Sequence, residues 1–163
     1  MKKRLLFIAS TLLLGGCMQA QEDITNISIM HDFEIPTALP FEVDQKQTII
    51  DIQHVDGIHQ YITSYDNDET GQFLKYILSQ HQTNETFVHD TLPHNDRYDE
   101  IFQLDNGTIL YYLEGTQTQS IYWAEKDNYV ATFTYMLRDT DGLGDYKLEV
   151  DELIDLVIQV HHS

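Results

Sequence analysis

Short segments in which polar and apolar residues alternate, separated by Asp, Asn and Gly turns, limit the fold of this chain more than any other feature. The clearest case is Tyr98–Leu104 and Thr108–Glu114, which flank Asp105-Asn106-Gly107. Asn-Gly and Asp-Gly pairs tolerate the left-handed backbone of tight hairpin turns. The pattern therefore predicts two antiparallel strands joined by a hairpin.

The same pattern recurs along most of the chain and predicts a sheet. Ser120–Glu125 and Tyr129–Leu137 form a second expected hairpin, turning at Asp127-Asn128. Within the second of these segments, Tyr129, Ala131, Phe133 and Tyr135 would share one face, because side chains alternate along a strand. Thr48–Val55 and Ile58–Tyr65 are further expected strands. Gln72–Ser79 fits neither the helix nor the strand period cleanly, and the turn residues up to Gly71 before it favour a strand over a helix.

The C-terminal segment has the period of a helix instead. Val150, Leu153, Ile154, Val157 and Val160 or His161 follow i, i+3, i+4, i+7 spacing, which places them on one apolar stripe. The sequence therefore predicts an α+β fold, an antiparallel β-sheet of six to eight strands with one C-terminal helix packed on a face.

The first residues have the layout of a signal peptide. Lys2-Lys3-Arg4 precede the apolar run Leu5–Leu14. This run is too short to span a bilayer, because a membrane-spanning helix needs roughly 20 residues. We therefore expect a signal peptide over 1–16, a lipidated cysteine and tether over 17–34, and a single α+β extracytoplasmic domain over 35–163.

Leu14-Gly15-Gly16-Cys17 resembles the lipobox of bacterial lipoproteins. The resemblance implies cleavage before Cys17 and diacylation of its thiol. Two acyl chains are enough for stable membrane anchoring. The expected location is the cell membrane, with the domain held on the extracytoplasmic side by lipid. The chain contains one cysteine, so an intramolecular disulfide is excluded.

The charge of the chain excludes one class of partner. Nine basic residues stand against 27 acidic ones, for a net charge of −18. Loss of Lys2, Lys3 and Arg4 with the signal peptide would leave six basic residues and a net charge of −21. Such a surface repels phosphate backbones, so nucleic acid is not an expected partner.

Two sets of residues are candidate binding sites. Asp139, Asp141 and Asp145 surround Gly142 and Gly144 in a pattern that partly matches a calcium-binding loop, although no ligand stands at the first and twelfth positions. An acidic strand-to-helix loop explains the same residues. Tyr112, Tyr122 and Trp123 are aromatic residues of expected strands. They could bind a ligand on a sheet face or belong to the core.

An enzymatic role has little support in the residues. The GxSxG nucleophile motif is absent, and Cys17 is assigned to lipid. A wall-glycan hydrolase would need two carboxylates about 5–10 Å apart, and 27 acidic residues supply many such pairs by chance. No catalytic residue is therefore assigned and no cofactor is expected, except possible Ca²⁺ at the aspartate loop.

Three segments together resemble one family. They are Ile35–Phe41, with its Pro, Leu-Pro and Phe; the Ser120–Tyr129 hairpin, with its Trp and Tyr; and the helix Leu148–Val157. They are similar to an extracytoplasmic domain of unknown function found in Gram-positive lipoproteins and appended to anti-sigma factors. The resemblance implies a sheet-plus-helix module with no catalytic residues to transfer.

The expected function is that of a non-catalytic, membrane-anchored accessory module that binds an envelope protein or a ligand. A calcium-responsive surface domain and, last, a wall-glycan hydrolase are the alternatives.

Overall fold

A computed structural model describes residues 34–53, 58–81, 87–92 and 97–161. All of these residues belong to one compact unit, which spans 33–163. The predicted signal peptide 1–16, the lipidation site Cys17 and the tether 17–34, apart from its last residue, lie outside the described residues.

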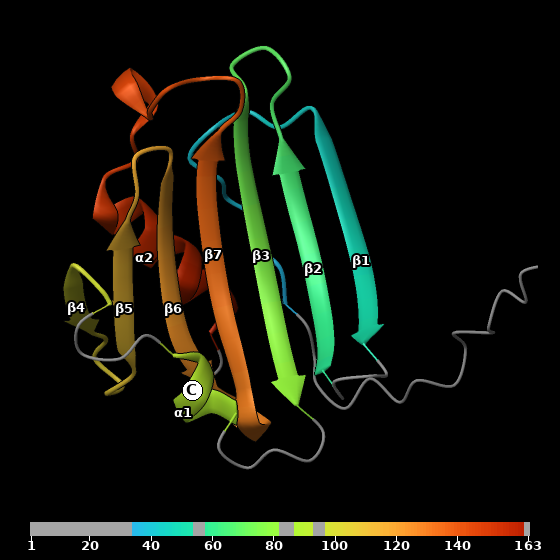
Figure 1. Ribbon diagram of the computed structural model, residues 1–163, viewed down its shortest axis with the longest axis vertical. Coiled ribbons are helices and arrows are strands. Elements are labelled where there is room, and N and C mark those ends of the chain that lie inside the picture. The colour runs from blue at the N-terminus through green and yellow to red at the C-terminus, as the bar shows by residue number, and fades with distance from the viewer. Residues whose placement is uncertain (1–33, 54–57, 82–86, 93–96, 162–163) are drawn as a thin grey trace, which may run out of the picture. The chain divides into compact units, whose positions relative to one another are not determined.

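Within these residues, seven antiparallel strands form one sheet in the order β1-β2-β3-β7-β6-β5-β4 (Figure 1). This architecture, with one C-terminal helix against the sheet, confirms the predicted α+β fold. The strands are β1 (Gln45–Gln53), β2 (Ile58–Asp66), β3 (Gln72–His81), β4 (Glu100–Gln103), β5 (Ile109–Glu114), β6 (Thr118–Glu125) and β7 (Tyr129–Leu137).

The sheet consists of two meanders that meet at its centre. β1, β2 and β3 are consecutive neighbours, as are β4, β5, β6 and β7. β3, the last strand of the first meander, pairs with β7, the last strand of the second. The pairing covers nearly the whole length of both strands, from Gln72 opposite Leu137 to Gln80 opposite Tyr129. After β3 the chain therefore crosses to the far edge of the sheet, where β4 lies, before it returns to the centre.

The turns follow from their residues. Gly107 has φ +91°, and its N–H donates to Leu104 O at 2.8 Å, which closes the predicted turn between β4 and β5. Asn128, at the predicted turn between β6 and β7, has φ +64° and ends a short 3₁₀ segment, Lys126–Asn128. Asn is one of the few non-glycine residues that adopt this conformation readily.

The helix α2 (Val150–Val160) packs on one face of the sheet, and the short helix α1 (Phe87–Thr91) lies on the other (Figure 1). Leu153, Val157 and Val160 are buried as predicted, but Leu156 is buried too, at 1% exposure, whereas Ile154 is only partly buried. The buried stripe is therefore rotated slightly from the predicted one. The helix α1 was not predicted, because its segment is polar and short.

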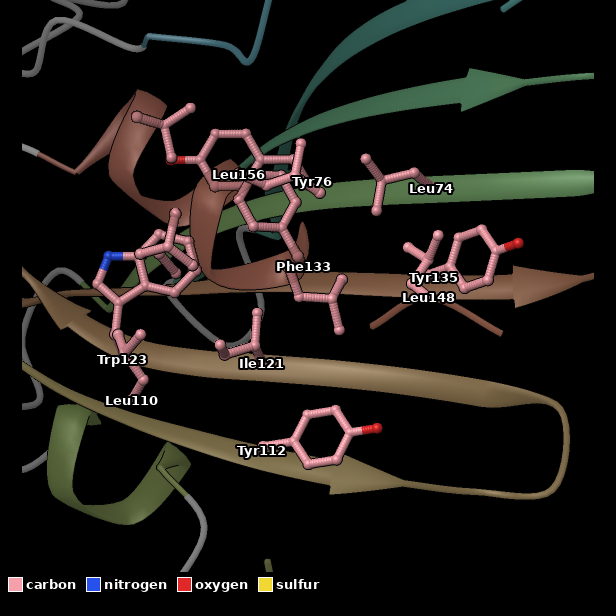
Figure 2. Packing of buried hydrophobic residues seen from close by; sticks show 14 of the residues in the cluster. Leu74, Tyr76, Leu110, Tyr112, Ile121, Trp123, Phe133, Tyr135, Leu148 and Leu156 are labelled. Carbon is pink, nitrogen blue, oxygen red and sulfur yellow. The ribbon is translucent and has the colours of Figure 1, made fainter. Parts of the chain in front are cut away.

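The core lies between the sheet and α2. Phe133 of β7 is flanked by Tyr76 of β3, with ring centroids 4.6 Å apart, and by Trp123 of β6 at 5.6 Å. Figure 2 shows these three rings together, with Leu156 beside them. The N-terminal segment also covers this face: Ile35, Leu39, Phe41 and Val43 pack against the core. The face that carries α2 is therefore the buried face, and we call the opposite one the open face.

The face assignment can be tested with two adjacent residues of β6. Trp123 is fully buried, whereas Tyr122 lies on the open face and is half-buried. Trp123→Ala should lower the free energy of unfolding by about 3–5 kcal/mol, because it leaves a cavity in the core. Tyr122→Ala, the matched control, should cost about 1 kcal/mol. Urea unfolding measures both, and equal losses would contradict the assignment.

Candidate functional site

Two of the three aromatic residues predicted to bind a ligand lie in the core instead. Trp123 is 0% and Tyr112 is 2% exposed. Both point toward α2, because Ile121, their neighbour on that face, pairs directly with Tyr112. The prediction rested on the number of aromatic residues in these strands, and it did not settle which of them face the helix. Tyr122, the third residue, lies on the open face and remains accessible to a partner.

The three aspartates predicted to bind calcium are exposed and do not converge. Asp139 follows β7 with φ +58°, and the loop is held by a hydrogen bond from Thr140 Oγ1 to Gly142 O. Among the described residues, no group of three or more His, Cys, Asp or Glu side chains is placed to hold a metal ion. This structure therefore gives the calcium hypothesis no preformed site.

Polar side chains of β6 hold α2 to the sheet at both ends. Near the start of the helix, Gln119 is fully buried and bonds both backbone groups of Leu148, with Gln119 Nε2 donating to Leu148 O at 2.8 Å and Leu148 N–H donating to Gln119 Oε1 at 3.0 Å. At the other end, Glu125 bonds His161, the residue that follows the helix. Between these two tethers, the helix-facing residues of β6 are Ile121 and Trp123.

The second tether is a buried carboxylate with three donors. The side chain of Glu125 is 1% exposed and that of His161 is 8% exposed. Glu125 Oε2 accepts from Trp123 Nε1 at 3.0 Å and contacts His161 Nδ1 at 2.7 Å, and Oε1 accepts from Lys126 N–H at 3.1 Å. His161 Nε2 lies 2.8 Å from Thr108 Oγ1. The network thus joins β6, the end of α2 and the turn before β5.

The hydroxyl of Thr108, the imidazole of His161 and the carboxylate of Glu125 follow one another in the order found at an activated nucleophile. Acyl transfer would need donors for an oxyanion beside the hydroxyl. Here Thr108 N–H donates to Asn106 Oδ1 at 3.0 Å, and Gly107 N–H donates to Leu104 O. Both nearby donors are engaged inside the turn, so the geometry favours a structural tether.

Hydrogen bonding outweighs burial at Glu125. Burial by itself would raise the pKa of Glu125, but the hydrogen bonds from His161, Trp123 and Lys126 N–H hold that pKa below its ordinary value. Hydrogen bonds from Lys147 and Tyr112 likewise lower the pKa of Glu114. A glycosidase acid needs a raised pKa. Neither carboxyl therefore suits the wall-glycan hydrolase considered above.

The open face carries exposed apolar side chains at the β4–β5 hairpin. Ile101 is 49%, Ile109 45% and Leu113 36% exposed. Tyr111 pairs with Ile101 on one side and with Tyr122 on the other, so these residues share a face. We call this set the open-face patch. It comprises Ile101, Ile109, Tyr111, Leu113 and Tyr122.

The open-face patch borders a hollow. A pocket of about 250 Å³ is lined by Ile109 and Tyr111 of the patch, together with Leu92, Thr108 and Ala124. Leu92, the residue that follows α1, forms one wall of the hollow. An apolar side chain of a partner could be anchored there, as in the pockets at the centre of many protein interfaces.

The sequence patterns did not predict the tethers or the open-face patch. A signal for the tethers was present, since Gln119 and Glu125 fall on the same face as Ile121 and Trp123 by strict alternation. Polar residues at buried strand positions normally have specific partners. The patch had a weaker signal, because its isoleucines and leucine alternate with residues that are also apolar.

Comparisons with known proteins add no relative. No family model, no curated protein and no solved structure matches the chain. The resemblance to the extracytoplasmic domain of unknown function therefore stays a prediction. Within the described residues, no helix is both long and apolar enough to cross a membrane.

The Glu125 tether predicts a pH dependence of stability. A carboxyl whose pKa is lowered on folding stabilises the protein above its ordinary pKa of 4.5, and this contribution is lost as the pH falls through the lower folded value. Glu125→Gln should therefore lose less stability between pH 7 and pH 3 than the parent. It should also cost about 1–3 kcal/mol at pH 7.

Denaturant unfolding at several pH values measures this effect. Glu100→Gln, on the exposed strand β4, is the matched control and should keep the pH profile of the parent. A Glu125→Gln profile as steep as that of the parent would contradict the proposed charge of the tether.

Proposed function

We propose that this protein is a non-catalytic lipoprotein, anchored by lipid on Cys17 at the extracytoplasmic side of a cell membrane, that binds another envelope protein through the open-face patch. The single observation that carries the binding role is the clustering of exposed apolar side chains on one face of the sheet, beside a pocket.

The support for anchoring comes from the sequence. A basic start, a short apolar run and Gly16-Cys17 follow one another within the first 17 residues. This order is typical of exported lipoproteins. The low number of basic residues argues against membrane attachment through a polybasic patch, so lipid on Cys17 is the simplest anchor.

The support for partner binding comes from the unequal cover of the two faces. On the buried face, α2 and the N-terminal segment cover the large apolar side chains. On the open face, Ile101, Ile109 and Leu113 remain exposed. Exposed apolar groups gathered in one place, with a polar surround, are typical of interaction sites.

The chemistry of the partner follows from this surface. Its contact region should be apolar, with a side chain that fits the pocket of about 250 Å³. A net charge of −18 repels acidic surfaces, so the rim of the partner should be neutral or basic. A second copy of this acidic chain fits that requirement poorly.

The anchor has a direct test. Cells that express the parent protein should incorporate radiolabelled palmitate into it, and Cys17→Ser should abolish the label, because the acceptor thiol is removed. Immunoprecipitation followed by fluorography measures the label. Palmitate that persists in the variant would show that the lipobox assignment is wrong.

The partner site is tested by crosslinking in intact cells followed by mass spectrometry. A recurrent envelope protein should be recovered with the parent, and its yield should fall at least tenfold with Ile109→Lys, because a charge in the patch must be desolvated on binding. Cys17→Ser should also reduce the yield, because the protein is then no longer held at the membrane.

The matched control is Ile158→Lys. Ile158 is 58% exposed and lies on α2, away from the open face. This variant makes the same chemical change at a similarly exposed isoleucine and should leave the crosslinked yield unchanged. Equal yields from the Ile109→Lys variant and the parent would contradict the open-face patch as the binding surface.

A further inference from the structure

A second pocket lies on the other side of the β4–β5 hairpin, against the end of α2. Its volume is about 390 Å³, within the range of small-molecule sites. The turn before β5 forms one side and the last turn of α2 forms the other. The lining residues are Gln103, Leu104, Asp105, Asn106, Ile158 and His161.

Three polar side chains of this pocket are held in place before any ligand arrives. His161 is fixed between Glu125 and Thr108, as described above. Asn106 Oδ1 accepts from Thr108 N–H at 3.0 Å, and Gln103 Nε2 donates to Gly107 O at 3.4 Å. Because these groups are already ordered, a ligand would lose less entropy on binding them.

The charge of the lining selects against anions. Among the described residues, no lysine or arginine lines the pocket, and Asp105 contributes an exposed carboxylate. Two amides, an imidazole and a carboxylate offer donors and acceptors suited to hydroxyl and amide groups. The carboxylate of Asp105 would repel a phosphate or carboxylate ligand.

An apolar wall completes the site. Ile158 is 58% exposed, the highest value among the large apolar side chains of the described residues, and it faces the pocket together with Leu104. A ligand that lies over Ile158 would remove this side chain from water. Sugars combine such requirements, since their C–H faces are apolar and their hydroxyl edges are polar.

We propose that this pocket binds a mono- or disaccharide that is neutral or carries an amino group. Asp105 would accept hydrogen bonds from its hydroxyl or acetamido N–H groups, and the side-chain amides of Gln103 and Asn106 would exchange hydrogen bonds with the same groups. Leu104 and Ile158 would lie against a ring face. This inference is independent of the proposed partner binding, because the two pockets share no lining residue and Ile158 and His161 lie at the end of α2, away from the open-face patch.

Saturation-transfer NMR of the full chain carrying Cys17→Ser tests the proposal. The probes are N-acetylglucosamine, its β-1,4-linked dimer and glucuronic acid. We expect saturation transfer to the first two, and binding of glucuronic acid at least tenfold weaker, because its carboxylate meets Asp105. Ile158→Lys should weaken N-acetylglucosamine binding at least fivefold, since the change removes the apolar wall.

The Leu113→Lys variant, which changes a residue of the open-face patch outside this pocket, is the control here and should bind N-acetylglucosamine like the parent. Circular dichroism of each variant verifies that it is folded. The proposal is overturned if the folded parent gives no saturation transfer with either N-acetylglucosamine probe, if glucuronic acid binds as well, or if Ile158→Lys binds like the parent. Loss of partner crosslinking in cells, by contrast, bears only on the open-face patch.

Discussion

The antiparallel pairing of β3 with β7 is the contact on which the rest of this fold depends. It joins two meanders that are otherwise separate, and its strands are far apart in the sequence. The pairing sets Tyr76 opposite Phe133, and Trp123 of the next strand then stacks against both. Because a shift of one residue in this pairing would turn Tyr76 to the face opposite Phe133 and Trp123, the register and the core specify each other.

The helix is placed on this core by polar contacts as well as apolar ones. Gln119 and Glu125 are six positions apart on β6, about 20 Å at the rise of a strand. The eleven residues of α2 are about 16 Å long at the rise of a helix, and Leu148 and Glu149 precede the helix while His161 follows it. The two lengths are therefore similar, so one strand can hold both ends of α2. Buried polar groups with full sets of partners fix one arrangement among many that apolar packing alone would tolerate.

The two faces of the sheet consequently differ in what they can do. The buried face is closed by α2 and by the N-terminal segment. The two are joined by the side chain of Gln159 on α2, which forms hydrogen bonds with the backbone of Thr37 and Ala38. The open face has α1 across part of it and keeps Ile101, Ile109 and Leu113 exposed at the β4–β5 hairpin. That hairpin contributes to both pockets, so one local element presents two different surfaces, one apolar and one polar.

The sequence by itself determined the strands, the hairpin turns, the C-terminal helix and the α+β class, because alternation, turn residues and helical spacing are local properties. The pattern that ends at Cys17 also predicts export and lipidation, and it is equally local. Only the tertiary structure decided the strand order, the burial of Tyr112 and Trp123, and the pairing of Glu125 with His161. These features depend on which face of the sheet meets the helix and on contacts between segments that are distant in the sequence. A local sequence pattern contains no information about either.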